Sequence, residues 1–293
     1  MVKHVWEELD REAIALIRDA GAVVAISVGA IEQHGGHMPV GTDSLLSRRV
    51  TAGAAELASS NILLAPALPY GFSPHHLSHA GTISLRLSTY LAVLRDMTES
   101  LVETGFRRIV FVNGHGGNSA PLRSAIAEMV TDGLPVTGVD YWVPGQAEWL
   151  AMLAGETHRF GHACEFETSL VLACLADRPD LAEKIRGKIV GLPARTVQPW
   201  ILPGSTDDPV TRAGAAWPPL FQKDDVGYFG DPAAATAETG TRMLALLQTR
   251  LATYFDQFAC TPLRVGRGMT GRQVSEPVGS ISGDELKGAD DVR

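Results

Sequence analysis

In AVVAISVGAIEQHGGHMPVGTD (Ala22–Asp43), an apolar run passes directly into a loop that carries carboxylates and imidazoles. The run, Ala22–Val28, is short, rich in β-branched residues and flanked by glycines, which predicts a buried strand of a parallel sheet. A helical pattern begins just after Asp43. The polar loop therefore joins the carboxyl end of a predicted strand to a helix, which is where ligands bind in open α/β sheets.

The loop brings three groups to that edge that are costly to bury: Glu32, His34 and Asp43. Burying a polar group without a partner costs on the order of 2–7 kcal/mol, and burying a charge costs more. A metal ion is the simplest partner that suits two carboxylates and an imidazole together. Asp43 taken alone is equally well explained as the N-cap of the following helix.

Strands and helices alternate along the rest of the chain. Further strands are predicted at 62–66, 108–112 and 136–139, and helices at 11–20 (after an Asp10 N-cap), 43–59, 87–105, from about 120, and at 146–155, 169–176 and 233–259. This alternation predicts an α/β fold, a three-layer αβα sandwich with a mostly parallel central sheet. In this interpretation residues 1–262 form a single domain and residues 263–293 a mobile C-terminal tail.

Composition excludes several classes of function. The 25 Lys and Arg against 33 Asp and Glu give a formal net charge of −8, and no basic run is present. We therefore expect neither nucleic acid nor a membrane as a partner. Three widely spaced cysteines form neither a disulfide framework nor a zinc finger and suit a reducing compartment. With no signal-peptide pattern at the N-terminus, a cytoplasmic location is expected.

Two more patches add candidate ligands. His115 lies in the glycine-rich turn Asn113–Asn118 after a predicted strand, and Glu165 and Glu167 open a helix. Each patch has an alternative explanation. The glycine-rich turn could bind a phosphate, although it lacks the spacing and the lysine of a P-loop. The two acids at the helix start could serve to complement the helix macrodipole. Because His115 and the first loop follow separate strands at the same sheet edge, a joint site is favoured.

The ligand set indicates a class of metal. Two imidazoles and three carboxylates suit a pair of divalent ions, with zinc as the first expectation and manganese or iron as alternatives. Two such ions bring four positive charges and three carboxylates bring three negative ones, so a bound hydroxide closes the balance. Metal coordination lowers the pKa of water to about 7, which makes that hydroxide a nucleophile for hydrolysis.

Three motifs resemble those of the creatininase (creatinine amidohydrolase) family: Val28–Gly35, Asn113–Asn118 and His162–Leu170. Two lesser signatures, Gly81-Thr82 and Gly230–Pro232, occur in the same order, so the resemblance covers residues 5 to 258. It implies a dinuclear metal hydrolase of αβα fold that assembles into closed homo-oligomers, often hexamers.

The resemblance also implies roles for single residues. Glu32 and His115 would bind one ion, His34 the other, and Asp43 would bridge the two. His162 occupies the position of the family's catalytic proton shuttle.

The chain departs from creatininase proper at Gly117, where that enzyme carries a metal-binding Glu. A carboxylate stands instead at Glu165, which we expect to complete the second metal site and to count among the catalytic residues. Glu165 and Glu167 lie two residues apart, so on a helix they point about 200° apart and cannot both face one ion. Glu167 is expected in a supporting role at the helix start. These features resemble the amide and formamide hydrolases and peptide-maturation enzymes of the family more than creatininase.

Substrate contacts are expected from Trp142, Tyr70 and His76. Tyr70 and His76 belong to a loop, 68–82, that is too long for a plain connector, and such loops are usually functional. His158 stands where creatininase has a substrate-contacting Trp. His75 and His79 shape the pocket or are solvated loop histidines.

The leading hypothesis is a dinuclear metal-dependent amidohydrolase that cleaves a C–N bond of a small or cyclic amide through a metal-bridging hydroxide. His162 would protonate the leaving nitrogen. The alternative within the family is a peptidase or deformylase in cofactor biosynthesis. Rivals from other classes are a non-hydrolytic metal-dependent isomerase or lyase, and a binding subunit that has kept the site without using it.

Overall fold

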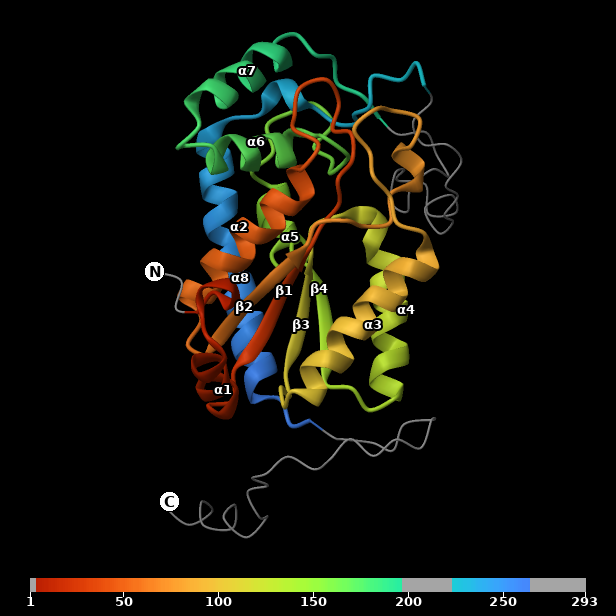
Figure 1. Cartoon of the computed structure of the whole chain (residues 1–293). Helices are drawn as coiled ribbons and strands as arrows, with labels where there is room; N and C mark the ends of the chain where they lie inside the picture. The colour runs from red at the N-terminus through yellow and green to blue at the C-terminus, as the bar shows by residue number, and fades with distance from the viewer. Residues whose placement is uncertain (1–3, 197–222, 264–293) are drawn as a thin grey trace, which may run out of the picture.

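A computed structural model of the chain describes residues 4–196 and 223–263 (Figure 1). In this described part, the sheet has four strands: β1 (Val23–Val28), β2 (Ile62–Leu68), β3 (Ile109–Asn113) and β4 (Val136–Asp140). Their order is β2-β1-β3-β4, and all three pairings are parallel. The predicted α/β fold with a parallel sheet is therefore confirmed.

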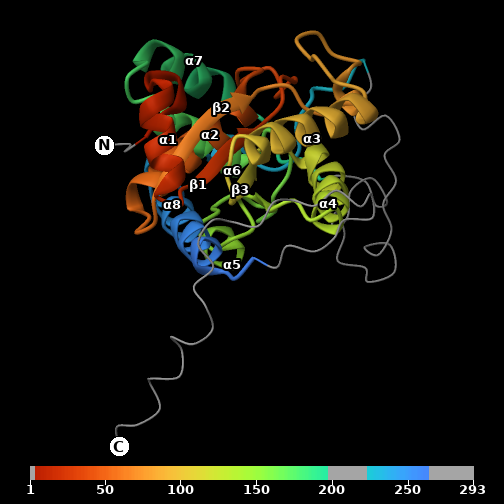
Figure 2. The same ribbon diagram turned by 60° about the horizontal axis from the view of Figure 1, so that its bottom comes forward.

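Alternate residues of β1 enter two separate cores, because successive side chains of a strand point to opposite faces. Val23 and Ala25 pack with α2 (Thr42–Leu57), α6 (Glu165–Cys174) and α8 (Ala237–Cys260). Val24 and Ile26 pack with α1 (Arg11–Asp19), α3 (Leu87–Glu103) and α4 (Gly116–Thr131). Figures 1 and 2 show the resulting layers, with α2 and α8 across the sheet from α3 and α4.

Helix ends follow local chemistry in several places. Asp10 accepts hydrogen bonds from the backbone N–H groups of Glu12 and Ala13 and caps α1 as predicted. Two short helices flank α6 in sequence: α5 (Gln146–Leu150), within the predicted 146–155, and α7 (Pro179–Ile189), which the sequence reading missed. Shorter helical turns within residues 4–196 and 223–263 are η1 (Trp6–Glu8), η2 (Pro74–His76) and η4 (Pro232–Ala234).

Some expectations fall outside the described residues. The predicted tail 263–293 lies there almost entirely. No helix of the described residues is long and apolar enough to cross a membrane.

The strand order determines where a site can form. From β1 the chain moves outward to β2, then returns to the other side of β1 for β3 and continues outward to β4. The direction therefore reverses between β1 and β3, and a crevice opens at the carboxyl ends of two such strands. Val28 pairs with Asn113, and the N–H of Gly114 donates to the carbonyl of Val28 (2.8 Å). The loops after β1 and β3 thus leave the sheet side by side.

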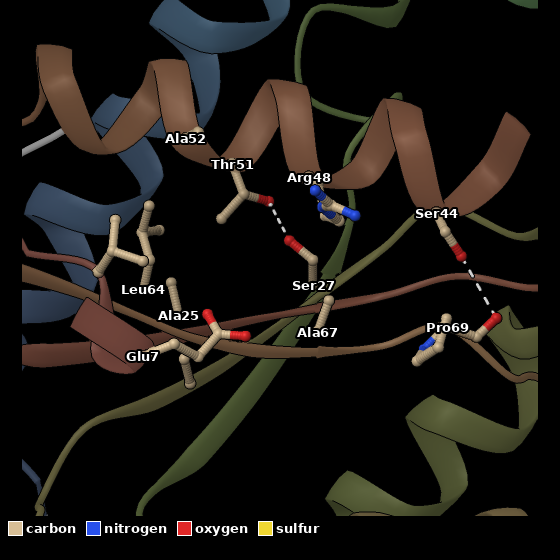
Figure 3. A pocket seen from close by; sticks show the side chains of 12 residues that line it. Glu7, Ala25, Ser27, Ser44, Arg48, Thr51, Ala52, Leu64, Ala67 and Pro69 are labelled. Carbon is tan, nitrogen blue, oxygen red and sulfur yellow. Dashed lines mark hydrogen bonds between the residues drawn. The ribbon is translucent and has the colours of Figure 1, made fainter. Parts of the chain in front are cut away.

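Helix α2 meets the sheet through small polar side chains (Figure 3). Ser27 of β1 and Thr51 of α2 share a hydrogen bond of 3.0 Å. Between α2 and the edge strand β2 lies a cavity of about 340 Å³, lined largely by alanine, serine and threonine, with Glu7 and Arg48 on its walls. None of the predicted site residues lines this cavity, although Ser44, the neighbour of Asp43, does.

Candidate metal centre

The centre is built around two buried carboxylates from the loop after β1. Glu32 is 1% and Asp43 2% exposed. The N–H of Glu32 donates to the carbonyl of Val40 (3.0 Å), which folds the loop back on itself, and Asp43 lies in the first turn of α2. Among the described residues, no donor forms a hydrogen bond with Oε1 or Oε2 of Glu32 or with Oδ2 of Asp43. Buried carboxylate oxygens of this kind require a cation.

Each oxygen of Asp43 faces a different imidazole. Oδ1 lies 3.0 Å from Nε2 of His34, and Oδ2 lies 3.1 Å from Nδ1 of His115. His34 donates its other ring N–H, from Nδ1, to the carbonyl of Glu32 (3.1 Å). His115 turns its Nε2 to the carbonyl of Phe72 (3.2 Å). In metal sites, a backbone carbonyl commonly fixes one ring nitrogen and leaves the other as ligand.

Three imidazoles surround Glu32. Nε2 of His115 lies 3.3 Å from Oε2, Nε2 of His76 lies 3.2 Å from Oε1, and Nδ1 of His162 lies 3.6 Å from the same oxygen. None of these approaches satisfies hydrogen-bond geometry at Glu32. The imidazoles therefore crowd the carboxylate as neighbouring ligands would. His75 stacks on His115, with ring centroids 5.7 Å apart.

The electrostatics of the cluster favour bound positive charge. Burial raises the pKa of Glu32, with the charge of Asp43 adding to the effect. Burial acts against protonation of His34, but the charge of Asp43 and the hydrogen bond to it raise the pKa of His34 to about 9. The charges of Glu32 and Asp43 likewise overcome burial and raise the pKa of His115. A divalent ion held by neutral imidazoles would supply the same positive charge directly, so these residues fit a metal centre.

Glu167 belongs to the cluster. Possible ligand atoms of His34, His162 and Glu167 lie within 4.8 Å of one another, as do those of Glu32, His34 and Asp43. Burial raises the pKa of Glu167 to about 7, although the positive charge of His34 acts against this rise. Its Oε2 accepts a hydrogen bond from the N–H of Ala163 (2.6 Å).

Glu165, which was predicted to complete the second site, shares no group of possible ligand atoms with the other predicted ligands among the described residues. Its two carboxylate oxygens accept hydrogen bonds from the backbone N–H groups of Ala154 (2.8 Å) and Gly155 (2.9 Å). Only one of the two acids faces the cluster, as expected from their spacing on the helix, and the acid that lies beside His34 and His162 is Glu167, whereas Glu165 had been predicted there. Cys164 is the N-cap of α6, so Glu167 is the third residue of the helix, and it reaches back to the N–H of Ala163, one residue before the N–H that the acid of a capping box bonds. This position was the missed signal.

Gly117 has no room for a side chain. A Cβ there would lie 2.6 Å from the carbonyl oxygen of Phe72 and 2.8 Å from Cε1 of His75, and would overlap Nε2 of His115. The Glu that creatininase carries at this position therefore cannot be introduced while His115 and the loop after β2 keep these positions.

Gln33 determines which nitrogens of two histidines carry hydrogen. Its Oε1 accepts from the N–H of Gly35 (2.8 Å), so its Nε2 is the donor to Nδ1 of His76 (3.0 Å). The carbonyl of Gln33 lies 2.7 Å from Nε2 of His162 and can only accept. The donor Nε2 of Gln33 also lies 3.2 Å from this nitrogen, but the carbonyl is the closer partner, so Nε2 of His162 carries the hydrogen and its unprotonated Nδ1 faces Glu32. Burial and the positive charge of His34 lower the pKa of His162, so the ring is neutral.

The other predicted residues are spread more widely. His76, 1% exposed, is part of the cluster. Trp142 packs against Tyr141 and Phe160 in an aromatic core, and Tyr70 is 41% exposed on the loop after β2. Nε2 of His79 donates to the carbonyl of Asp225 (2.9 Å).

Comparison with known proteins agrees with the fold and the motifs. The family described as creatinine amidohydrolase matches residues 7–255. The mycofactocin precursor peptide peptidase of Mycobacterium tuberculosis (strain CDC 1551 / Oshkosh) is 33% identical over 232 residues, covering 76% of this chain and 80% of that protein. The creatinine amidohydrolase of Pseudomonas putida is 30% identical over 230 residues, covering 72% and 84%.

Solved structures extend the likeness to the backbone. A crystal structure of creatinine amidohydrolase (creatininase) matches with a TM-score of 0.68 and 27% identity, over 88% of this chain and 98% of that one. A manganese form of creatininase matches with a TM-score of 0.66 and 26% identity, over 88% and 99%. A mutant creatininase of the Zn-Zn type gives 0.65 and 26%, over 88% and 98%. The buried carboxylates and their imidazoles thus lie in a fold whose solved relatives include manganese and zinc forms, and the chain belongs to the creatininase (creatinine amidohydrolase) family of hydrolases.

Proposed function

We propose that the protein is a dinuclear metal-dependent amidohydrolase that cleaves a C–N amide bond. The observation that carries this proposal is the orientation of the Asp43 carboxylate, which directs one oxygen to His34 and the other to His115. A carboxylate in this arrangement suits a bridge between two ions. Glu32 and His115 would hold one ion, and His34 with Glu167 the other.

The ions would be divalent, with zinc as the first expectation and manganese or iron as alternatives. The solved relatives in manganese and zinc forms support this choice. Bound ions would supply Lewis acidity and an activated water molecule to the reaction.

His162 would move the proton. Its neutral ring holds Nε2–H on the carbonyl of Gln33 and presents an unprotonated Nδ1 to the cluster. It would first accept a proton at Nδ1 from the attacking water and then pass it to the leaving nitrogen as the C–N bond breaks. His76, which also borders Glu32, would lie beside the substrate, and we keep Trp142 and Tyr70 as proposed substrate contacts.

The substrate is proposed to be a small or cyclic amide. The alternative is a peptide bond, and the 33% identity to a mycofactocin precursor peptide peptidase supports that alternative. We also propose that the protein works in the cytoplasm as a homo-oligomer, with neither nucleic acid nor membrane as a partner.

The test is a turnover assay of the purified full chain, reconstituted in turn with zinc, manganese and iron. The substrates are a panel of lactams, hydantoins and formamides, together with short peptides. Asp43→Ala serves as the inactive control. Hydrolysis of the small amides supports the proposal, and hydrolysis of peptides alone selects the peptidase. Failure to hydrolyse any small amide or any peptide of the panel would refute the hydrolase function. A product that keeps its C–N bond would indicate an isomerase or lyase.

A further inference from the structure

His37 is a buried histidine that the candidate metal centre does not use. It is 4% exposed and follows His34 in the same loop, yet it belongs to none of the ligand groups found in the described residues. Its Nε2 lies 3.1 Å from the carbonyl oxygen of Ala163, in a segment 126 residues away in the chain. Its Nδ1 has no hydrogen-bond partner among the described residues.

The chemistry of this contact makes His37 a donor. A carbonyl can only accept, so Nε2 carries the hydrogen and Nδ1 is unprotonated. Burial lowers the pKa of His37 to about 4, so the ring is neutral near pH 7. Nδ1 lies against Gly35, where an added Cβ would come within 2.7 Å of it. The ring is therefore held between the first loop and Ala163.

Ala163 has an unusual backbone. Its φ is +53°, in the left-handed region that residues other than glycine rarely adopt, and the residue is fully buried. Such conformations persist only where the surroundings hold them and are common at functional sites. Two side chains hold this one: Glu167 accepts from its N–H (2.6 Å), and His37 donates to its carbonyl.

The residue before Ala163 is His162. The carbonyl of His162 accepts from the N–H of Phe229 (2.8 Å), and its ring donates to the carbonyl of Gln33. The turn at Ala163 is the point at which the chain leaves His162 and enters α6. A change in its φ would therefore rotate His162 relative to Glu167, which shares a candidate ligand group with it.

We propose that His37 is a positioning residue that holds Ala163 in its left-handed conformation, so that His162 presents Nδ1 to the metal centre. The consequence for turnover rests on the proposed function, whereas the backbone and ring consequences do not. The competing explanation is packing alone, because His37 also meets the ring of Tyr228 edge-on and lies 3.3 Å from the hydroxyl of Thr168.

The experiment uses the zinc-loaded full chain and five variants, one of which is Ala163→Gly alone. His37→Met removes the donor at similar size, and His37→Gln keeps an N–H donor. Ala163→Gly accepts positive φ without strain, and we combine it with His37→Met. Ala30→Gly combined with His37→Met is the matched control, since Ala30 is equally buried in the same region but has no positive φ.

We expect His37→Met to keep its zinc and lose kcat by roughly 10- to 100-fold, as for a misplaced catalytic group, with a smaller change in KM. His37→Gln and Ala163→Gly should stay near the wild type. Ala163→Gly should restore most of the kcat lost in His37→Met, and Ala30→Gly should not. Equal effects of both glycines, or no rescue by Ala163→Gly, would overturn the proposal in favour of packing.

Ring ¹⁵N shifts give a readout that is independent of turnover. In the wild type, His37 should be neutral with its hydrogen on Nε2; a hydrogen on Nδ1 overturns the proposal even if no variant folds. The His162 resonances should shift in His37→Met and return in the double variant with Ala163→Gly. If the wild type hydrolyses no amide while these shifts appear, the proposed function fails and the positioning role stands.

Discussion

Two segments supply most of the candidate centre, and they are built in opposite ways. Residues 29–43 run from the end of β1 to the start of α2, and their one left-handed residue is a glycine, Gly35. Residues 158–167 contain two left-handed residues that are not glycine, His158 and Ala163. The first segment leaves carboxylate oxygens of Glu32 and Asp43 without donors, whereas both acids of the second accept backbone hydrogen bonds.

The difference between the two segments indicates that they have different roles in the centre. The first segment holds the charges that attract cations, and it is anchored at its two ends by β1 and α2, with Glu32 held in the loop between them by its hydrogen bond to Val40. The irregular segment holds His162 at an angle that regular structure does not provide, and its backbone is stabilised from outside. Substitutions in the first segment should therefore remove ions. Substitutions in the second segment should change which side chains face the ions.

The largest effect is expected from Asp43→Ala. If each oxygen of Asp43 serves a different ion, its removal should release both, and elemental analysis of the purified variant should find almost none. Asp231→Asn is the matched control, because Asp231 is also a buried acid but accepts from the N–H of Thr157 instead. Retention of one full ion in Asp43→Ala would show that the carboxylate is not shared.

Substitutions of Glu165 and Glu167, the two acids of the second segment, should have different effects on metal content. Glu167→Gln should lose one ion and keep the other. Glu165→Gln should keep both, and should lower the free energy of unfolding by about 1–3 kcal/mol because it weakens two charge-assisted hydrogen bonds to the backbone. Metal content and chemical denaturation of both variants test this. The reverse pattern would return Glu165 to the metal site.

A third segment, the turn after β3, tests how tightly the imidazoles are held. Gly117→Ala places a methyl group against His115 and the carbonyl of Phe72, so His115 must move. We expect metal affinity to fall by roughly 10- to 100-fold, the usual scale for a disturbed support of a ligand. Gly116→Ala is the control, since a Cβ there meets nothing within 4 Å. Competition with a chelator measures both, and equal affinities would show that the site adapts freely.

The side chains of the first segment could be placed at the sheet edge from the sequence because its signals are local. An apolar strand followed by Glu32 and His34 places both side chains at the sheet edge, and Asp43 is close enough to the helix start to join them. The same reasoning placed His115 after β3. The order β2-β1-β3-β4, which brings the two loops together, depends on pairing between distant strands and cannot be read locally.

The second segment could not be read in this way. The choice between Glu165 and Glu167 depends on the direction of the chain before α6. This direction is set by the left-handed conformation of Ala163, a position where the sequence has no glycine to indicate such a turn. Helix α7 was missed although it carries local signals: Pro179 stands at its start, and Leu181, Ala182, Ile185 and Ile189 recur at helical spacing. His76 was predicted from its loop, but its place beside Glu32 depends on Gln33.

The last expected effect, spread over more than two pH units, is on the pH dependence of stability, and it arises where the two segments meet, at His37. Burial lowers the pKa of His37 from the ordinary 6.5 to about 4 in the folded chain. Between these values the unfolded chain binds a proton that the folded chain does not, so the unfolding free energy falls as pH is lowered from 6.5 to 4 and is unaffected by this group above 6.5. The full contribution is about 3 kcal/mol. His37→Gln, which keeps a donor for Ala163 but does not titrate, should lose less stability than the wild type over this range. Denaturant titrations of both proteins, with metal removed by a chelator, give the difference between their curves. Parallel curves would mean that burial does not lower the pKa of His37 in the folded chain, so that its ring titrates alike in the folded and unfolded states.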